Sequence, residues 1–153
     1  MAPTLATRYV FNLAIKVGAP IEAGDFGYGH RRVIPILGGE LTGEGMHGTI
    51  REGGADYQVI RPDGLTELEA KYAIEMDDGA IIYIENIGIR FGPKDALDKI
   101  RRGQPVDPAL IYFRSVPRFE TGALSYRWLM HSLFIGVGTR HPDRVELDVH
   151  QVL

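Results

Sequence analysis

Residues 55–90 have the sequence ADYQVIRPDGLTELEAKYAIEMDDGAIIYIENIGIR, in which two turn sequences separate three extended segments. Pro62-Asp63-Gly64 and Asp77-Asp78-Gly79 combine residue types that favour tight turns between strands. Between these turns, apolar and charged residues alternate with the period of a strand that buries one face. The pattern predicts two consecutive antiparallel hairpins, formed by residues 56–61, 65–76 and 80–90.

The same alternation continues along most of the chain. It predicts further strands at residues 9–17, 33–37, 40–50, 110–116, 126–138 and 145–153. Residues 94–102 instead space their apolar side chains at helical intervals, after Pro93 and before Gly103, which predicts one short helix.

About eight to ten strands with a single short helix are typical of an all-β protein. We predict a single domain over residues 1–153, folded as a closed or nearly closed antiparallel β-barrel. A sandwich of two sheets is the alternative that counting strands leaves open. A barrel of about eight strands is either filled by side chains or holds one small ligand.

The composition excludes several classes of function. The formal net charge is −3, so there is no electrostatic reason to expect nucleic acid or an anionic membrane as a partner. The chain has no Cys, which excludes a disulfide framework and a thiolate metal site. It has no signal-peptide pattern and no apolar window of about 20 residues, so we expect a cytoplasmic protein. A small organic ligand or substrate is the expected partner, and self-association into a homo-oligomer is left open.

No cofactor or metal site is predicted. The five His residues are scattered and lack the spacing of metal-binding motifs. The glycines of residues 43–48 are not set between a strand and a helix, as a phosphate-binding loop would be. No Ser lies in a nucleophile-elbow sequence.

Acid/base chemistry remains, and three residues are the candidates for it. Asp56 is the candidate general base, because a carboxylate partly removed from water has a raised pKa. Tyr72 could donate a hydrogen bond to an oxygen that gains charge, and Arg114 could bind a carboxylate or phenolate. The structural alternative is that Asp56 forms an ion pair with Arg61, Lys71 or Arg114. The sequence does not settle which strand face points inward, because a one-residue bulge reverses it.

Aromatic and polar neighbours of these residues are the candidates for substrate binding. Aromatic side chains offer large apolar contacts to a planar ligand, although each could equally fill the core. The predicted binding residues are Tyr57, Gln58, Tyr112, Phe119, Tyr126, Trp128 and Met130.

A series of motifs in fixed order resembles one known family over nearly the whole chain. The series includes Gly29-His30-Arg31-Arg32, Gly53-Gly54-Ala55-Asp56-Tyr57-Gln58, Leu68-Glu69-Ala70-Lys71-Tyr72, Pro117-Arg118-Phe119-Glu120 and Tyr126-Arg127-Trp128-Leu129. It resembles the DUF3237 family, also called the UPF0311 proteins. The resemblance implies a lipocalin-like β-barrel and no assigned activity. This chain departs from the family pattern at Tyr57, Lys71 and Met130, where Trp, Arg and Asn are usual.

The residues therefore predict a cofactor-independent enzyme for a small, mostly apolar, oxygenated molecule. Isomerisation, cyclisation by conjugate addition and hydration would all use an acid/base carboxylate with groups that stabilise an oxyanion. The alternative is a barrel that carries a small hydrophobic ligand without changing it. A third, weaker alternative is a fully packed structural module.

Overall fold

Antiparallel pairing joins all the strands of this protein, as the alternating pattern predicts. The computed structural model describes residues 1–153. Its elements are β1 (Thr7–Val17), β2 (Ile21–Asp25), β3 (His30–Gly43), β4 (Met46–Ile50), β5 (Ala55–Ile60), β6 (Thr66–Met76), β7 (Ile81–Phe91), α1 (Lys94–Arg101), the 3₁₀ helix η1 (Pro108–Leu110), β8 (Tyr112–Glu120), the 3₁₀ helix η2 (Leu124–Met130), β9 (Phe134–Arg140) and β10 (Arg144–Val152).

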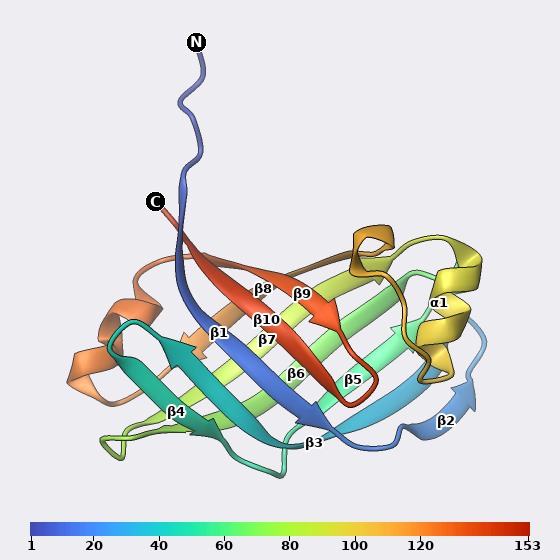
Figure 1. Cartoon of the computed structure of the whole chain (residues 1–153), viewed down its shortest axis with the longest axis horizontal. Helices are drawn as coiled ribbons and strands as arrows, with labels where there is room; N and C mark the ends of the chain where they lie inside the picture. Colours follow the sequence, from blue (N-terminus) through green and yellow to red (C-terminus); the bar gives the residue numbers. More distant parts are fainter.

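The strands close into a barrel (Figure 1). From β6 the order runs through β7, β8, β9, β10 and β1 to β3. The gap between β3 and β6 is filled by β4 at one end and by β5 at the other. This is a closed eight-stranded barrel with two additional strands, which confirms the predicted barrel over the sandwich. The two predicted hairpins, β5–β6 and β6–β7, form part of its wall.

The helix α1 confirms the predicted helix at residues 94–102, one residue shorter. Gly103 follows it with φ of +77°, and the backbone N–H of Gln104 donates to the carbonyl of Lys99. The helix ends here because Gly103 adopts a left-handed backbone conformation that turns the chain away from the helix. Glycine adopts this conformation without the strain that other residues would have.

The strand predicted at residues 126–138 is wrong in its first half. Residues 124–130 form η2 instead, and Leu129 of this short helix is buried against the core. The strand predicted at residues 110–116 begins two residues later and extends further, because β8 runs from Tyr112 to Glu120. Pro117 pairs with Asn86 of β7 but lies beyond the residues of β8 that pair with β9, which are Arg114 and Ser115, so on that side it occupies an edge position.

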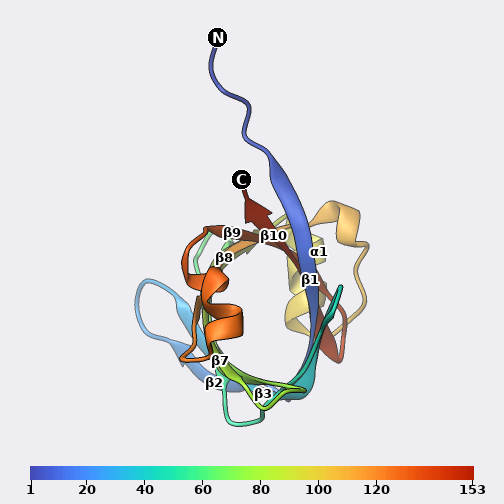
Figure 2. The same cartoon turned by 90° about the vertical axis from the view of Figure 1, so that its left-hand side faces the viewer.

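The aromatic side chains of the hydrophobic core gather toward η2. Phe119 packs edge-on against both Phe11 and Phe134, with ring centroids 5.7 and 5.3 Å apart. Trp128 of η2 lies against Phe134 from the end of the barrel. Figure 2 looks along the barrel from this end, with η2 in front. The pocket lies at the opposite end of the barrel, which carries α1.

No helix in the structure is long and apolar enough to cross a membrane.

Candidate functional site

A cavity of about 520 Å³ opens at the end of the barrel that carries α1. Its polar wall includes Arg32, Asp56, Gln58, Arg90 and Arg140. A smaller, mostly apolar compartment of about 50 Å³ lies deeper, and its lining includes the aliphatic side chains Ile15, Ile36, Leu68 and Leu147. Asp56 and Arg90 line both spaces, so they lie where the polar entrance meets the apolar interior. We call the two spaces together the α1-end pocket.

Asp56 points into the barrel because its neighbours on both adjacent strands do so. It lies opposite Ile34 of β3 and Ala70 of β6, and residues that face each other across antiparallel strands share a face of the sheet. Its Oδ2 accepts a hydrogen bond from Gln58 Nε2 at 2.8 Å, and its Oδ1 accepts one from the Glu69 backbone N–H at 3.0 Å. Both bonds hold the carboxylate in one orientation.

The carboxyl group of Asp56 is held by hydrogen bonds and not by an ion pair. None of the ion pairs in the structure includes it. Burial raises the pKa of Asp56 above its ordinary value, while the hydrogen bond from Gln58 and the charge of Arg90 offset part of that rise. The predicted structural bridge to Arg61, Lys71 or Arg114 is therefore absent.

Arg90 is a buried guanidinium without a carboxylate partner. It lies on β7 between the inward-facing Thr66 and Phe113, and only 5% of it is exposed. Its Cζ is 5.6 Å from the centroid of the Phe113 ring, and its Nε has no hydrogen-bond partner. Burial lowers the pKa of Arg90 to about 10, against the opposing effect of Asp56, so the group remains charged at neutral pH.

Two further arginines accompany Arg90 on the pocket wall. Arg32 of β3 is buried, and it donates to Glu22 Oε1 at 2.9 Å and to the Arg101 carbonyl at 3.4 Å. Arg140 of β9 donates to the Gln104 carbonyl at 3.0 Å. Burial lowers the pKa of Arg140, and the positive charge of Arg32 lowers it further. We call Arg32, Arg90 and Arg140 the arginine cluster.

Several polar atoms around the pocket are buried without a hydrogen-bond partner. They are Gln58 Oε1, Asn86 Oδ1, Arg90 Nε, Ser115 Oγ and the Tyr72 hydroxyl oxygen. Leaving one such group unpaired costs about 1–3 kcal/mol, so folded proteins rarely keep several together without a functional reason. All except Tyr72 belong to residues that line the pocket. A ligand with polar atoms of its own could satisfy them.

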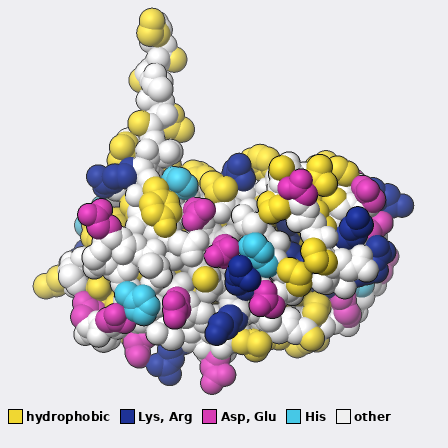
Figure 3. Space-filling model, in the orientation of Figure 1, with side chains coloured by type: hydrophobic (Ala, Val, Ile, Leu, Met, Phe, Trp, Pro, Cys, Tyr) yellow, Lys and Arg dark blue, Asp and Glu magenta, His cyan; other side chains and the backbone are white.

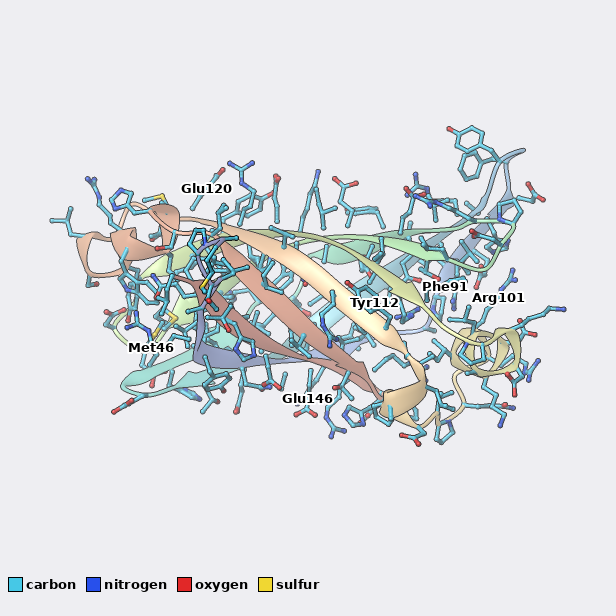
Figure 4. The ribbon with its side chains drawn as sticks, turned by 90° about the horizontal axis from the view of Figure 1, so that it is seen from above. Met46, Phe91, Arg101, Tyr112, Glu120 and Glu146 are labelled. Carbon is cyan, nitrogen blue, oxygen red and sulfur yellow. The ribbon has the colours of Figure 1, made fainter.

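The structure brings two of the three predicted catalytic residues together. Asp56 lines the pocket, and Tyr72 is buried on the same inward face of β6 as Ala70, the residue opposite Asp56, two positions along the strand. Arg114 lies on the outer face of β8, where it stacks over Tyr112 with its Cζ 5.4 Å from the ring centroid. Figure 4 labels Tyr112 at the start of β8, beside Phe91 of β7.

Of the seven predicted binding residues, only Gln58 lines the pocket. Tyr57 and Tyr112 are exposed, and the inward-facing neighbours of each show that they lie on the outer side of the wall. Phe119 and Trp128 pack in or against the core toward η2. At the same end, the Tyr126 hydroxyl donates to Asp78 Oδ2 at 3.2 Å, and Met130 is exposed.

The pocket residues absent from the sequence prediction could have been found from their register. On β7, Asn86 and Arg90 fall on the same alternating face as Ile82 and Ile84, which are fully buried. A charged or amide side chain in phase with core positions is a signal for a site inside a barrel. No comparable signal marks Arg140, the partly buried last residue of β9.

Comparison with known proteins gives matches over the whole chain. A family model described as "Protein of unknown function (DUF3237)" matches residues 5–152. A UPF0311 protein of Rhodopseudomonas palustris is 60% identical over 153 residues, which is 100% of both chains. A UPF0311 protein of Clostridium acetobutylicum is 43% identical over 144 residues, covering 94% of this chain and 91% of that one.

Solved structures share the same barrel. A conserved protein of unknown function from R. palustris superposes with a TM-score of 0.97 at 59% identity, covering 99% of this chain and 100% of that chain. A protein from Acinetobacter baumannii, described as β-barrel-like, gives 0.86 at 32% identity, with 100% and 99% covered. An enzyme from Penicillium herquei gives 0.74 at 18% identity, with 100% and 98% covered, a likeness that concerns the fold alone.

Proposed function

This chain belongs to the DUF3237 family, and we propose that it is an enzyme that moves a proton on a small, oxygenated organic molecule bound in the α1-end pocket. The observation that carries the proposal is Asp56, a carboxylate inside the barrel that is hydrogen-bonded but not ion-paired. Its raised pKa brings the carboxyl closer to the range in which it can both take and return a proton.

Asp56 acts as the base in the first step. It removes a proton from a carbon next to a carbonyl, the C–H electron pair forms a new C=C bond, and the carbonyl oxygen takes the negative charge. The protonated Asp56 then returns the proton to another carbon of the conjugated system, which completes an isomerisation. In a cyclisation or hydration, Asp56 takes the proton from a hydroxyl or a water that adds to a conjugated C=C bond, and returns it to the carbon beside the carbonyl.

The neighbouring groups support these steps. Gln58 holds the carboxylate by its hydrogen bond of 2.8 Å, and the guanidinium of Arg90 offers N–H donors to the oxygen that gains charge. Arg90 therefore takes the role that the sequence suggested for Arg114. The second candidate donor is Tyr72, which follows Ala70 by two residues on β6 and whose buried hydroxyl has no hydrogen-bond partner.

A carrier of small hydrophobic ligands is the second candidate function. The apolar compartment lined by Leu68, Phe113 and Leu147 favours it, because this space of about 50 Å³ would take the end of a hydrocarbon chain without any chemistry. The two functions differ in whether a bound ligand exchanges its protons.

Deuterium exchange in heavy water tests the proposed function. Phenylacetone, cyclohexanone, phenylpyruvate and 2-oxohexanoate each carry an acidic C–H beside a carbonyl, and NMR follows its replacement by deuterium. We expect the protein to accelerate exchange in at least one compound above the buffer rate. Asp56→Asn should abolish the acceleration and Tyr72→Phe should reduce it.

Glu75→Gln is the matched control for this experiment. Glu75 is a carboxylate on β6 that pairs with Arg51 at 2.9 Å on the outer side of the barrel. Its replacement should leave exchange unchanged. Acceleration that survives Asp56→Asn would contradict the role of Asp56, and binding without any exchange would favour the carrier.

A further inference from the structure

The α1-end pocket carries an excess of positive charge in a chain that is negative overall. Its outer cavity is lined by five arginines and three acids, namely Arg32, Arg90, Arg101, Arg102 and Arg140 against Glu22, Asp56 and Asp143. Five minus three leaves an excess of two positive charges, while the whole chain has a formal net charge of −3. Figure 3 shows Lys and Arg side chains gathered on the surface at the α1 end.

The acids on the wall leave two members of the arginine cluster without partners. Glu22 already pairs with Arg32 and lies within hydrogen-bond distance of His30, and Asp143 lies 3.3 Å from Arg144. Neither Arg90 nor Arg140 takes part in any ion pair. Bringing unpaired guanidinium groups together away from water is costly, so folded proteins rarely do so without an anion.

Most N–H donors of the cluster are not used within the protein. Arg32 uses Nε and one terminal nitrogen within the protein, and Arg140 uses one terminal nitrogen. Arg90 keeps Nε unpartnered, and its guanidinium is supported by the ring of Phe113. This supply suits a planar anion with two oxygens, which a guanidinium binds through two parallel N–H···O bonds.

We infer that the molecule bound in the α1-end pocket carries a carboxylate, which Arg90 binds with its planar fork while Arg140 and Arg32 complete the anion site. The inference rests on the pocket assigned in the proposed function and names its substrate class, an amphipathic carboxylic acid. The apolar part of the acid lies in the cavity of about 520 Å³, and its tip reaches past Asp56 into the compartment of about 50 Å³ lined by Leu68 and Leu147. This orientation places the carbons nearest the carboxylate beside the base, and the N–H donors of Arg90 that the carboxylate does not use remain for the oxygen that gains charge in the proposed function.

The test is the binding of matched ligands, measured by isothermal titration calorimetry at millimolar concentration. The probes are 3-phenylpropanoate, its neutral amide 3-phenylpropanamide, and the dianion 2-phenylethyl phosphate. We expect the acid to bind at least about tenfold more tightly than the amide. No measurable binding of the acid, equal binding of acid and amide, or tighter binding of the phosphate would overturn the inference.

Variants locate the anion site. Arg90→Lys keeps the positive charge but loses the planar fork of N–H donors. Arg140→Gln removes a positive charge that is less deeply buried. Each variant should bind the acid about tenfold or more weakly, while its binding of the amide should change little. Because Arg90 is buried, a melting curve must accompany its variant, and Arg140→Gln provides the test if Arg90→Lys unfolds. A retained preference for the acid in Arg140→Gln would contradict the assignment.

Arg114→Gln is the control, since Arg114 also stacks on an aromatic ring but lies outside the barrel. It should leave binding of the acid unchanged. Asp56→Asn separates this inference from the proposed function, because it should abolish proton exchange yet bind the acid at least as tightly as the natural chain. If Asp56→Asn loses proton exchange but still binds the acid, both the proposed function and the carboxylate site are supported. If the natural chain exchanges protons of neutral ketones but shows no preference for the acid over the amide, only the inference of a carboxylate substrate is refuted.

Discussion

Asp56 is held where its charge lowers the stability of the folded protein. Only two hydrogen bonds and the charges of Arg90 and Arg32 compensate its burial, and its pKa remains raised. Active sites often retain such a group because the reaction requires it, at a cost to stability. The sequence predicted Asp56 and Gln58 for the site, since a short polar run beside glycines on a strand is unusual.

Replacing Asp56 should therefore stabilise the protein in a pH-dependent way. A raised folded-state pKa means that the contribution of this group to stability is full below the unfolded pKa and is lost as the pH rises through the folded pKa. Asp56→Asn carries no charge at any pH. We expect its free energy of unfolding to exceed that of the natural chain by about 0.5–2 kcal/mol at pH 8, and by less at pH 4.

Urea unfolding at the two pH values measures this difference. If Asp56→Asn is less stable than the natural chain by the same amount at both pH values, the carboxylate stabilises the fold, contrary to the expectation.

At the scale of elements, β9 shapes the pocket because Gly138 has no side chain. Gly138 faces Phe113, and a Cβ at this position would lie 2.5 Å from Phe113 Cδ1. The absence of a side chain at Gly138 therefore lets the Phe113 ring lie where it supports Arg90. The sequence did not reveal this dependence, because a glycine inside a strand can also mark a bulge or a bend.

Gly138→Ala should disturb both packing and binding. The added methyl group displaces a buried aromatic ring, which should lower the free energy of unfolding by about 1–3 kcal/mol. It should also weaken binding of 3-phenylpropanoate, since Arg90 loses its support. Gly122→Ala is the matched control, because nothing lies within 4 Å of its Cβ position. Denaturation and calorimetry check both effects, and an unperturbed Gly138→Ala would contradict the packing argument.

For the whole molecule, closure of the barrel depends on the first strand. β1 pairs with β10 along one edge and with β3 along the other, so it joins the last strand of the chain to the third. Residues 1–6 before it are exposed and extend away from the barrel (Figure 1). The contribution of this end of the chain to stability should therefore begin with β1.

Two changes at the N-terminal end should differ sharply in their effect. Deleting residues 1–5 should leave the midpoint of urea unfolding unchanged, because these residues are exposed and lie outside β1. Leu13→Ala should lower the free energy of unfolding by about 2–5 kcal/mol, since Leu13 is fully buried in the closing strand. Comparable losses from both changes would mean that the extended segment contributes to the fold.

The amino-acid sequence by itself determined the class of fold, the hairpins β5–β6 and β6–β7 and the helix α1, and it identified Asp56 as a candidate site residue. These depend on local information: alternation along a strand, turn residues, and capping by Gly103. The direction of each strand face, the placement of η2 over one end and the meeting of Arg32, Arg90 and Arg140 were decided only in the tertiary structure. Closure of the barrel brings together residues that are distant in the chain, and no local pattern encodes their distance in space.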